Sequence, residues 1–169
     1  SMVIWTTTPW TLPANLAVCL HPEFVYVAVS HGDVTYIVAE DLLSSLVAEW
    51  EMTDYKVLES CKGAEWENAV CRHPFIDRES KVILGDHVTL EQGTGCVHTA
   101  PGHGQDDYIV GLKYGLEPYN PVNNAGVFVP EVEHFGGMFV RKANPEIVEK
   151  LRQDGSLILA KDIKHSYPH

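Results

Sequence analysis

Two β-branched and aromatic runs separated by three residues constrain the fold of this chain most strongly. FVYVAVS at 24–30 and VTYIVA at 34–39 flank the sequence HGD, a pattern that predicts a β-hairpin. Other short apolar runs, bounded by Gly, Pro or charged residues, predict further strands. These are VIWTTT at 3–8, LAVCL at 16–20, YKVLES at 55–60, KVILG at 81–85, GCVHT at 95–99 and SLILA at 156–160. A chain with so many short strands requires a hydrophobic core built on β-sheet.

Helical patterns are fewer and lie between the strands. EDLLSSLVAEW at 40–50 carries its leucines on one face, and another helix is expected from near Gln105 to Gly115. A third helix, NPEIVEKLRQDG at 144–155, is expected to have Asn144 as its cap, Pro145 at its first position and Gly155 at its end. The sequence therefore predicts a mixed α/β fold, with a curved β-sheet or β-barrel core and peripheral helices.

Composition bounds the class of protein. The 169 residues, 45% hydrophobic, are enough to bury one core, so we expect a single domain over residues 1–169. We expect Ser1 and Met2 to be left by cloning and the rest to be excised from a larger protein. No apolar run reaches the ~20 residues that span a bilayer, and no signal-peptide pattern opens the chain. A monomeric, cytoplasmic fragment that binds no membrane is expected.

Cysteine spacing and charge exclude further classes. The four cysteines form no C-x-x-C pair, which argues against a zinc knuckle and a disulfide scaffold and favours a reducing compartment. The net charge of −11 arises from 23 acidic and 12 basic residues. Phosphate neutralisation is therefore not a general property of the surface, and any nucleic-acid role must be local.

The stretch GTGCVHTAPGHGQDDY at 93–108 is the first candidate functional segment. It predicts a Gly-rich turn between a strand and a helix, with backbone N–H groups facing a cleft. Asp106 and Asp107 would also suit the first turn of a helix for purely structural reasons, because the helix dipole stabilises them by roughly 0.3–1 kcal/mol. A metal site could use Cys96, His98, His103 and the two aspartates, but their spacing matches no familiar zinc pattern. A Cys96–His98 nucleophile pair is a further alternative, although a strand cysteine is more often a small buried hydrophobe.

The segment TTTPWTLPAN at 6–15 is the second candidate. It groups hydroxyls that a half-buried strand does not need. A structural interpretation is also open, because threonine favours strands and Trp5 and Trp10 could belong to the core. Taken in order, the two segments resemble the editing domain of isoleucyl-tRNA synthetases, the connective insertion of these class I enzymes. The resemblance continues through ILGDHVTLEQGTG at 83–95, YGLEPYNPV at 114–122 and HSYP at 165–168.

The resemblance implies proofreading hydrolysis of valine esterified to isoleucine tRNA, with valyl-adenylate as a further candidate substrate and the isoleucyl product excluded by size. The class I aminoacylation motifs H-x-G-H and K-M-S-K-S are missing, so aminoacyl-adenylate synthesis is not expected. No cofactor and no metal are expected; ATP and zinc would belong to the rest of the synthetase. Partners would be the 3′ terminal aminoacyl-adenosine, its valine moiety and the remaining synthetase in cis.

The resemblance also implies roles for individual residues. Asp107 would receive the substrate ammonium, His98 and Trp10 would form a wall against isoleucine, and Gly102 and Gly104 would allow close backbone approach. A polar face around the ester and the adenosine would consist of Thr6, Thr7, Thr8, Thr11 and Asn15. The catalytic candidates are Thr7, Thr8, His98 and Asp107.

No residue is an obvious general base. The free ribose hydroxyl is therefore a candidate for positioning the water, assisted by His98 or the threonines. Three alternatives stay open: a non-catalytic module that binds an aminoacyl-nucleotide, the editing domain of a valyl-tRNA synthetase, and a freestanding metal-dependent hydrolase.

Overall fold

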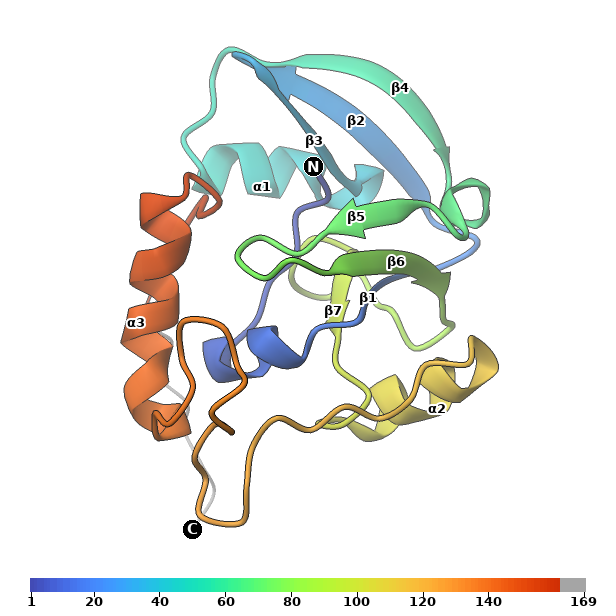
Figure 1. Cartoon of the computed structure of the whole chain (residues 1–169). Helices are drawn as coiled ribbons and strands as arrows, with labels where there is room; N and C mark the ends of the chain where they lie inside the picture. Colours follow the sequence, from blue (N-terminus) through green and yellow to red (C-terminus); the bar gives the residue numbers. More distant parts are fainter. Residues whose placement is uncertain (162–169) are drawn as a thin grey trace, which may run out of the picture.

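A computed structural model of the chain describes residues 1–161. Short strands in groups of one to three are separated by helical segments, and two α-helices follow the last strand (Figure 1). The strands are β1 (Ala17–Leu20), β2 (Val25–His31), β3 (Val34–Ala39), β4 (Lys56–Lys62), β5 (Val70–Arg72), β6 (Glu79–Leu84) and β7 (Val97–Thr99). The α-helices are α1 (Leu43–Glu49), α2 (Gln105–Lys113) and α3 (Val140–Gln153). The 3-10 helices are η1 (Pro9–Ala14), η2 (Glu40–Leu42) and η3 (Gly63–Trp66). The predicted mixed α/β fold is confirmed.

The strands of the described region form a four-stranded and a three-stranded sheet. The first has the order β5-β6-β1-β7, with β1 parallel to β6 and antiparallel to β7. In the second, β2 lies between β3 and β4, antiparallel to both, and its register to β4 shifts between Ala28 and Val29. Such an irregularity bends a strand and increases its twist. All four residues of β1 are buried, as expected of an inner strand with both faces covered.

The two sheets pack over a shared hydrophobic cluster. Its buried members are Val18, Leu20, Tyr26, Ile37, Ala39, Val82 and Cys96. The Tyr26 hydroxyl donates a hydrogen bond to the Gly95 carbonyl at 2.6 Å and accepts one from the His21 N–H at 3.0 Å. A side chain at Gly95 would collide with Ala39, because an added Cβ would lie 2.6 Å from the Ala39 Cβ. These contacts hold the residues before β7 against the second sheet.

The hairpin predicted around HGD is confirmed. Its last pair joins His31 and Val34, which leaves Gly32 and Asp33 as the two turn residues. Gly32 has a φ of +59°, a conformation that favours glycine.

Helices α1 and α2 form close to where the sequence places them. η2 precedes α1, and α1 buries Leu46 and Val47. α2 begins at Gln105, and the chain leaves the helix through Gly115 with a φ of +70°. Over residues 1–161 no helix is long and apolar enough to cross a membrane.

The start of α3 differs from the prediction. The helix begins at Val140 with Phe139 as its N-cap, so Asn144 is not the cap and Pro145 lies inside the helix instead of at its first position. The reason is tertiary packing, because the buried face of α3 includes Ala143, upstream of the expected start. The predicted end is confirmed: Gly155 has a φ of +73° and the N–H of Ser156 bonds the Leu151 carbonyl at 2.9 Å.

Two of the predicted strands are wrong. Within residues 3–8 Trp5 forms an isolated bridge with Val97, and the preceding Met2 forms another with Ile37, before the chain enters η1. Residues 156–160 form no ladder with the rest of the described chain. A β-forming composition gives a strand only where a neighbouring strand offers its hydrogen bonds. The HSYP motif at 165–168 lies outside the described residues.

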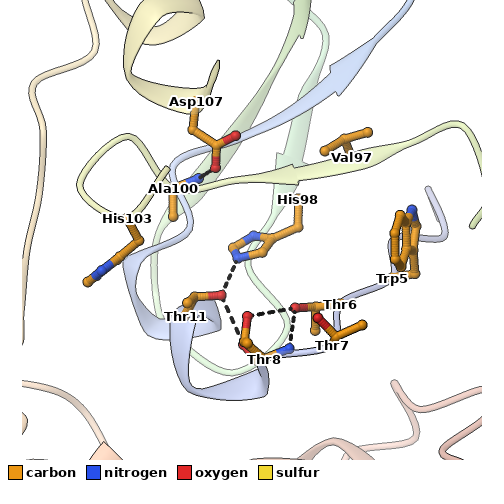
Figure 2. A pocket seen from close by; sticks show the side chains of 10 residues that line it. All are labelled: Trp5, Thr6, Thr7, Thr8, Thr11, Val97, His98, Ala100, His103 and Asp107. Atoms are coloured by element: carbon orange, nitrogen blue, oxygen red, sulfur yellow. Dashed lines mark hydrogen bonds between the residues drawn. The ribbon is translucent and has the colours of Figure 1, made fainter. Parts of the chain in front are cut away.

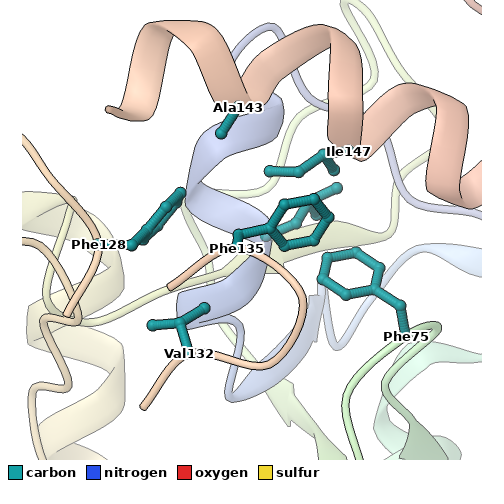
Figure 3. Close-up of a cluster of buried hydrophobic side chains, with 7 residues drawn as sticks. Phe75, Phe128, Val132, Phe135, Ala143 and Ile147 are labelled. Atoms are coloured by element: carbon teal, nitrogen blue, oxygen red, sulfur yellow. The ribbon is translucent and has the colours of Figure 1, made fainter. Parts of the chain in front are cut away.

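A second hydrophobic cluster packs against η1. α3 lies over it, with Ala143 and Ile147 facing the aromatic rings of Phe75, Phe128 and Phe135 (Figure 3). The cluster also contains Leu12 of η1, together with Val132. Because η1 follows the threonine run directly, this packing fixes the threonine-rich segment in place.

Candidate active site

A pocket of about 220 Å³ forms where the N-terminal segment meets β7 and the start of α2 (Figure 2). Its lining residues are Trp5, Thr6, Thr7, Thr8, Thr11, Val97, His98, Ala100, His103 and Asp107. The two sequence segments singled out above therefore face the same cavity. Six residues of the predicted site line it: Thr6, Thr7, Thr8, Thr11, His98 and Asp107.

The threonine run forms a tight turn into η1. The Thr8 N–H donates a hydrogen bond to Oγ1 of Thr6 at 3.0 Å. The Thr11 hydroxyl and the Thr11 N–H both donate to the Thr8 carbonyl, each at 3.0 Å. Thr7 is exposed, and its hydroxyl makes no hydrogen bond within residues 1–161. The Thr7 hydroxyl is therefore available as donor and acceptor to a ligand in the pocket.

His98 on β7 is the buried wall of the pocket. Its Nε2 lies 3.0 Å from the Thr11 hydroxyl, and its Nδ1 lies 2.7 Å from the amide nitrogen of Asn15. Burial lowers the pKa of His98 to about 4, and the nearby His73 and His103 act in the same direction. His98 is therefore neutral near pH 7.

Asp107 is the carboxylate of the pocket. One of its oxygens accepts a hydrogen bond from the Ala100 N–H at 2.9 Å, and Figure 2 shows the other oxygen without a bond to the residues drawn. Burial raises the pKa of Asp107 above its ordinary value, whereas the Ala100 N–H and the nearby His87 lower it. The position of Asp107 in the first turn of α2 also favours the charged form. The arrangement can hold one negative charge inside a half-buried cavity.

The other four residues of the predicted site do not line the pocket. Trp10 packs against the second hydrophobic cluster. Its ring lies edge-on to that of His103, with 5.1 Å between the ring centroids. Asn15 lies behind His98 as its hydrogen-bond partner. At Gly102 a Cβ would lie 2.3 Å from the Tyr119 carbonyl oxygen. At Gly104 a Cβ would lie 3.2 Å from the Asp107 carboxyl group. Both glycines thus leave room for neighbouring parts of this chain to pack closely.

Four lining residues were not among the predicted site residues, although His103 was considered as a metal ligand and Trp5 as a core residue: Trp5, Val97, Ala100 and His103. Trp5 is the most informative, because its indole ring lies directly over Gly93, where an added Cβ would be 1.9 Å from the indole nitrogen. The φ of Gly93 is +79°, which also favours glycine. Gly93 opens the segment singled out at 93–108, but nothing in the sequence pairs that glycine with Trp5.

Two basic side chains hold η1 from outside the pocket. Nε2 of the buried His73 donates to the Leu12 carbonyl at 2.7 Å, and its Nδ1 accepts from the Ile76 N–H at 3.1 Å. Arg78 donates to the backbone carbonyls of Pro13 and Asn15 at 2.8 and 3.0 Å. The Leu12 carbonyl also accepts from the Asn15 N–H at 2.9 Å, whereas Arg78 provides the donors for the Pro13 and Asn15 carbonyls at the end of η1.

The cysteine and metal alternatives receive no support from the geometry. Cys96 is fully buried, and burial raises the pKa of its thiol, so the thiolate needed for attack is disfavoured. The Cys19 thiol is buried as well, with its pKa raised to about 12. Within the described residues, His, Cys, Asp and Glu side chains form no group of three placed to hold a metal ion.

Comparison with curated sequences gives matches over essentially the whole chain. The chain is 56% identical over 169 residues to isoleucine–tRNA ligases of Thioalkalivibrio sulfidiphilus and Syntrophotalea carbinolica, covering 100% of the chain and 18% of each relative. The Bacillus cereus isoleucine–tRNA ligase is 53% identical over 167 residues, covering 99% of the chain and 18% of the relative. The chain thus spans about 18% of the length of these relatives. No family model matches the chain.

Solved structures share the fold. The GlLeuRS-CP1 structure superposes with a TM-score of 0.75 at 18% identity, covering 96% of this chain and 84% of that one. The editing domain of the P. falciparum cytosolic leucyl-tRNA synthetase superposes with a TM-score of 0.66 at 12% identity, covering 90% and 77%.

Proposed function

Because the chain belongs to the isoleucine–tRNA ligase family, as a segment with the fold of the synthetase CP1 editing domain, we propose that it hydrolyses valine esterified to isoleucine tRNA. The observation that carries the proposal is the convergence of a threonine hydroxyl, a neutral histidine and a carboxylate on one small pocket. Valyl-adenylate is a second candidate substrate for the same pocket.

Side-chain size explains why such an activity is needed. Valine lacks one methylene of isoleucine, and a pocket built for isoleucine rejects valine by only about 1–3 kcal/mol. Isoleucyl-tRNA synthetase is itself the known example of this small discrimination. A second pocket can discriminate in the opposite direction, because steric collision excludes the larger side chain. The rigid walls of the pocket, among them the buried His98 and the Trp5 ring seated on Gly93, suit this task.

Asp107 is proposed to anchor the substrate. A carboxylate held by the Ala100 N–H keeps an oxygen for the α-ammonium of the aminoacyl group. Hydrogen bonds between charged groups of this kind contribute about 1.5–3 kcal/mol. The anchor fixes the ester relative to the threonines, and such positioning is a main source of rate acceleration.

The threonines are proposed to act on the ester. The Thr7 hydroxyl is free to donate to the carbonyl oxygen as charge develops on it, and Thr8 lies next to it at the start of η1. Water would attack the carbonyl carbon, the bond to the ribose oxygen would break, and free valine and a free ribose hydroxyl at the 3′ end of the tRNA would result. The ribose hydroxyl beside the ester remains our candidate for placing the water.

The remaining binding functions are assigned to other parts of the synthetase. With a net charge of −11, the fragment is proposed to bind the 3′ terminal aminoacyl-adenosine and to leave tRNA binding to the rest of the enzyme in cis. We propose that it uses no cofactor and acts as a monomeric segment in the cytoplasm.

Deacylation of charged tRNA tests the proposal. The chain is mixed with valine-charged and with isoleucine-charged isoleucine tRNA, and release of the amino acid is followed over time. We expect faster release of valine, with the difference abolished by Asp107→Asn and kept by Asp106→Asn, the matched neighbouring variant. Binding of both esters without hydrolysis would instead indicate a non-catalytic binding module.

A further inference from the structure

We propose that Ser80 is a positioning residue, which acts through Asn15 to keep His98 in the tautomer whose Nε2 carries the proton. The inference concerns the pocket of the proposed function and rests on it for its relevance to hydrolysis. Ser80 lies on β6, outside the pocket, and neither segment singled out in the sequence contains it.

The buried hydroxyl of Ser80 has a single polar partner in the described chain. Ser80 is 3% exposed, and its Oγ donates a hydrogen bond to Oδ1 of Asn15 at 2.7 Å. A buried hydroxyl without a partner costs roughly 1–3 kcal/mol, so this bond ties Ser80 to Asn15.

The orientation of the Asn15 amide follows from its surroundings. Its Nδ2 lies 3.0 Å from the Ala17 carbonyl oxygen, which can only accept a hydrogen bond. The nitrogen must therefore face Ala17, and the oxygen faces Ser80. The same nitrogen lies 2.7 Å from Nδ1 of His98 and donates its second proton there.

The tautomer of His98 follows from this orientation. Nδ1 receives an N–H and must present a lone pair, so the single proton of the neutral ring is on Nε2. Nε2 then donates to the Thr11 hydroxyl at 3.0 Å, and that hydroxyl donates to the Thr8 carbonyl at 3.0 Å. Each group in this chain of hydrogen bonds thus donates to the next, from Ser80 to the threonines of the pocket.

This order restricts what His98 can do. A protonated Nε2 can donate a hydrogen bond but cannot take a proton from water, so His98 is a fixed donor and wall instead of a general base. The titratable groups near His98 are His73, which follows β5, and His103 in the turn before α2. Arg78, whose guanidinium bonds the Asn15 carbonyl, is the nearby cation on the β6 side.

The tautomer can be observed directly by NMR. Long-range proton–nitrogen spectra of the ¹⁵N-histidine-labelled chain distinguish a protonated from an unprotonated ring nitrogen, and a His98→Asn variant assigns the signal. In the wild type we expect a neutral His98 with the proton on Nε2. An Nδ1-protonated ring in the wild type would overturn the proposal without any variant.

Three variants test the role of Ser80. Ser80→Ala should populate the Nδ1-protonated ring beside the Nε2-protonated one, because Oδ1 of Asn15 then loses its donor and the Ala17 carbonyl alone still orients the amide. Asn15→Asp should move the proton to Nδ1, because a carboxylate can only accept, and should raise the pKa of His98. Thr99→Val is the matched control: it removes another buried hydroxyl, which bonds the Val97 carbonyl at 3.1 Å next to His98, and should leave the tautomer unchanged.

A tautomer in Ser80→Ala identical to that in the wild type and in Thr99→Val would contradict the proposal. Because the spectra need no substrate, failure of this inference is distinguishable from failure of the proposed hydrolysis.

Discussion

The Thr11 hydroxyl lies 3.0 Å from Nε2 of His98, which joins two segments separated by 87 residues in the chain. This contact brings η1 and β7 together at the pocket, and Asn15 completes it from the opposite side of the His98 ring. Thr11, His98 and Asn15 therefore form one hydrogen-bonded unit, and the Thr7 hydroxyl and the Asp107 carboxylate line the same pocket.

The Thr7 hydroxyl should be needed for hydrolysis but not for folding. Thr7→Val keeps the shape of the side chain and removes its one hydroxyl. Loss of one donor to a developing oxyanion lowers kcat by roughly 10²–10³-fold in other acyl-transfer enzymes, so we expect a decrease toward that size. Single-turnover deacylation of valine-charged tRNA measures it. Thr53→Val, at another exposed threonine, is the control, and equal rates for the two variants would exclude a catalytic role for Thr7.

Gly93→Ala should destabilise the fold more than the positive φ of Gly93 alone would. Gly93→Ala places a Cβ 1.9 Å from the Trp5 indole, whereas Gly137→Ala, at a similar φ of +83°, meets open space. The left-handed conformation costs each variant roughly 1–2 kcal/mol, and overpacking adds about 1–3 kcal/mol for Gly93→Ala alone. Urea unfolding compares the two variants. Equal losses of stability would show that Trp5 is not seated on Gly93.

Asn144 should stabilise η1 rather than the start of α3. Its Oδ1 accepts a hydrogen bond from the Trp10 N–H at 2.8 Å. In Asn144→Ala we expect faster hydrogen exchange at the Trp10 amide and a loss of about 1 kcal/mol in stability. Glu146→Ala, an exposed change on the same helix, should leave that amide protected. Faster exchange confined to the first turn of α3 would support the capping role that the sequence suggested.

Acid should destabilise the fold in part through His73. Burial lowers the pKa of His73 to about 4, whereas an unfolded histidine titrates near 6.5. Above about pH 6.5 both states are neutral and the full stability is present. Between about pH 6.5 and 4 the unfolded state binds the proton first, so the free energy of unfolding falls, by up to about 3 kcal/mol.

Urea unfolding at several pH values, with wild type and His73→Gln, measures this contribution. The glutamine can still donate to the Leu12 carbonyl, and it removes one titrating group. The variant should therefore lose less stability on acidification, while His98 continues to contribute in both proteins. Identical pH dependence in the two proteins would show that His73 is not held neutral by the fold.

Local patterns were enough to predict much of the fold. The hairpin at 24–39 and helix α2 depend on short-range signals, the Gly32 turn and the acidic first turn, and both are confirmed. The strand expected at 3–8 was wrong because pairing depends on distant partners, and these offer isolated bridges: Val97 to Trp5, and Ile37 to the preceding Met2. Likewise, the sequence NP at 144–145 is typical of a helix start, but burial of Ala143 extends α3 upstream.

The site could be predicted only in part for the same reason. The resemblance brought together the threonine run, His98 and Asp107, which line one pocket in the structure. Trp5 on Gly93 and Ser80 behind Asn15 are contacts between residues far apart in the chain, and neither residue type signals its partner. Asn15 was predicted to face the substrate; in the structure its side chain is saturated by Ser80, Ala17 and His98.

The most direct test of the account is calorimetric titration of the chain with non-hydrolysable mimics of valyl-adenosine and isoleucyl-adenosine esters. We predict that the valyl mimic binds more tightly, that Asp107→Asn removes this binding, and that Asp106→Asn retains it. Asparagine at 107 can still accept from the Ala100 N–H, so the loss would report the charge and not the fold. Equal affinity for the two mimics, or unchanged binding in Asp107→Asn, would contradict a size-selective pocket anchored by this carboxylate.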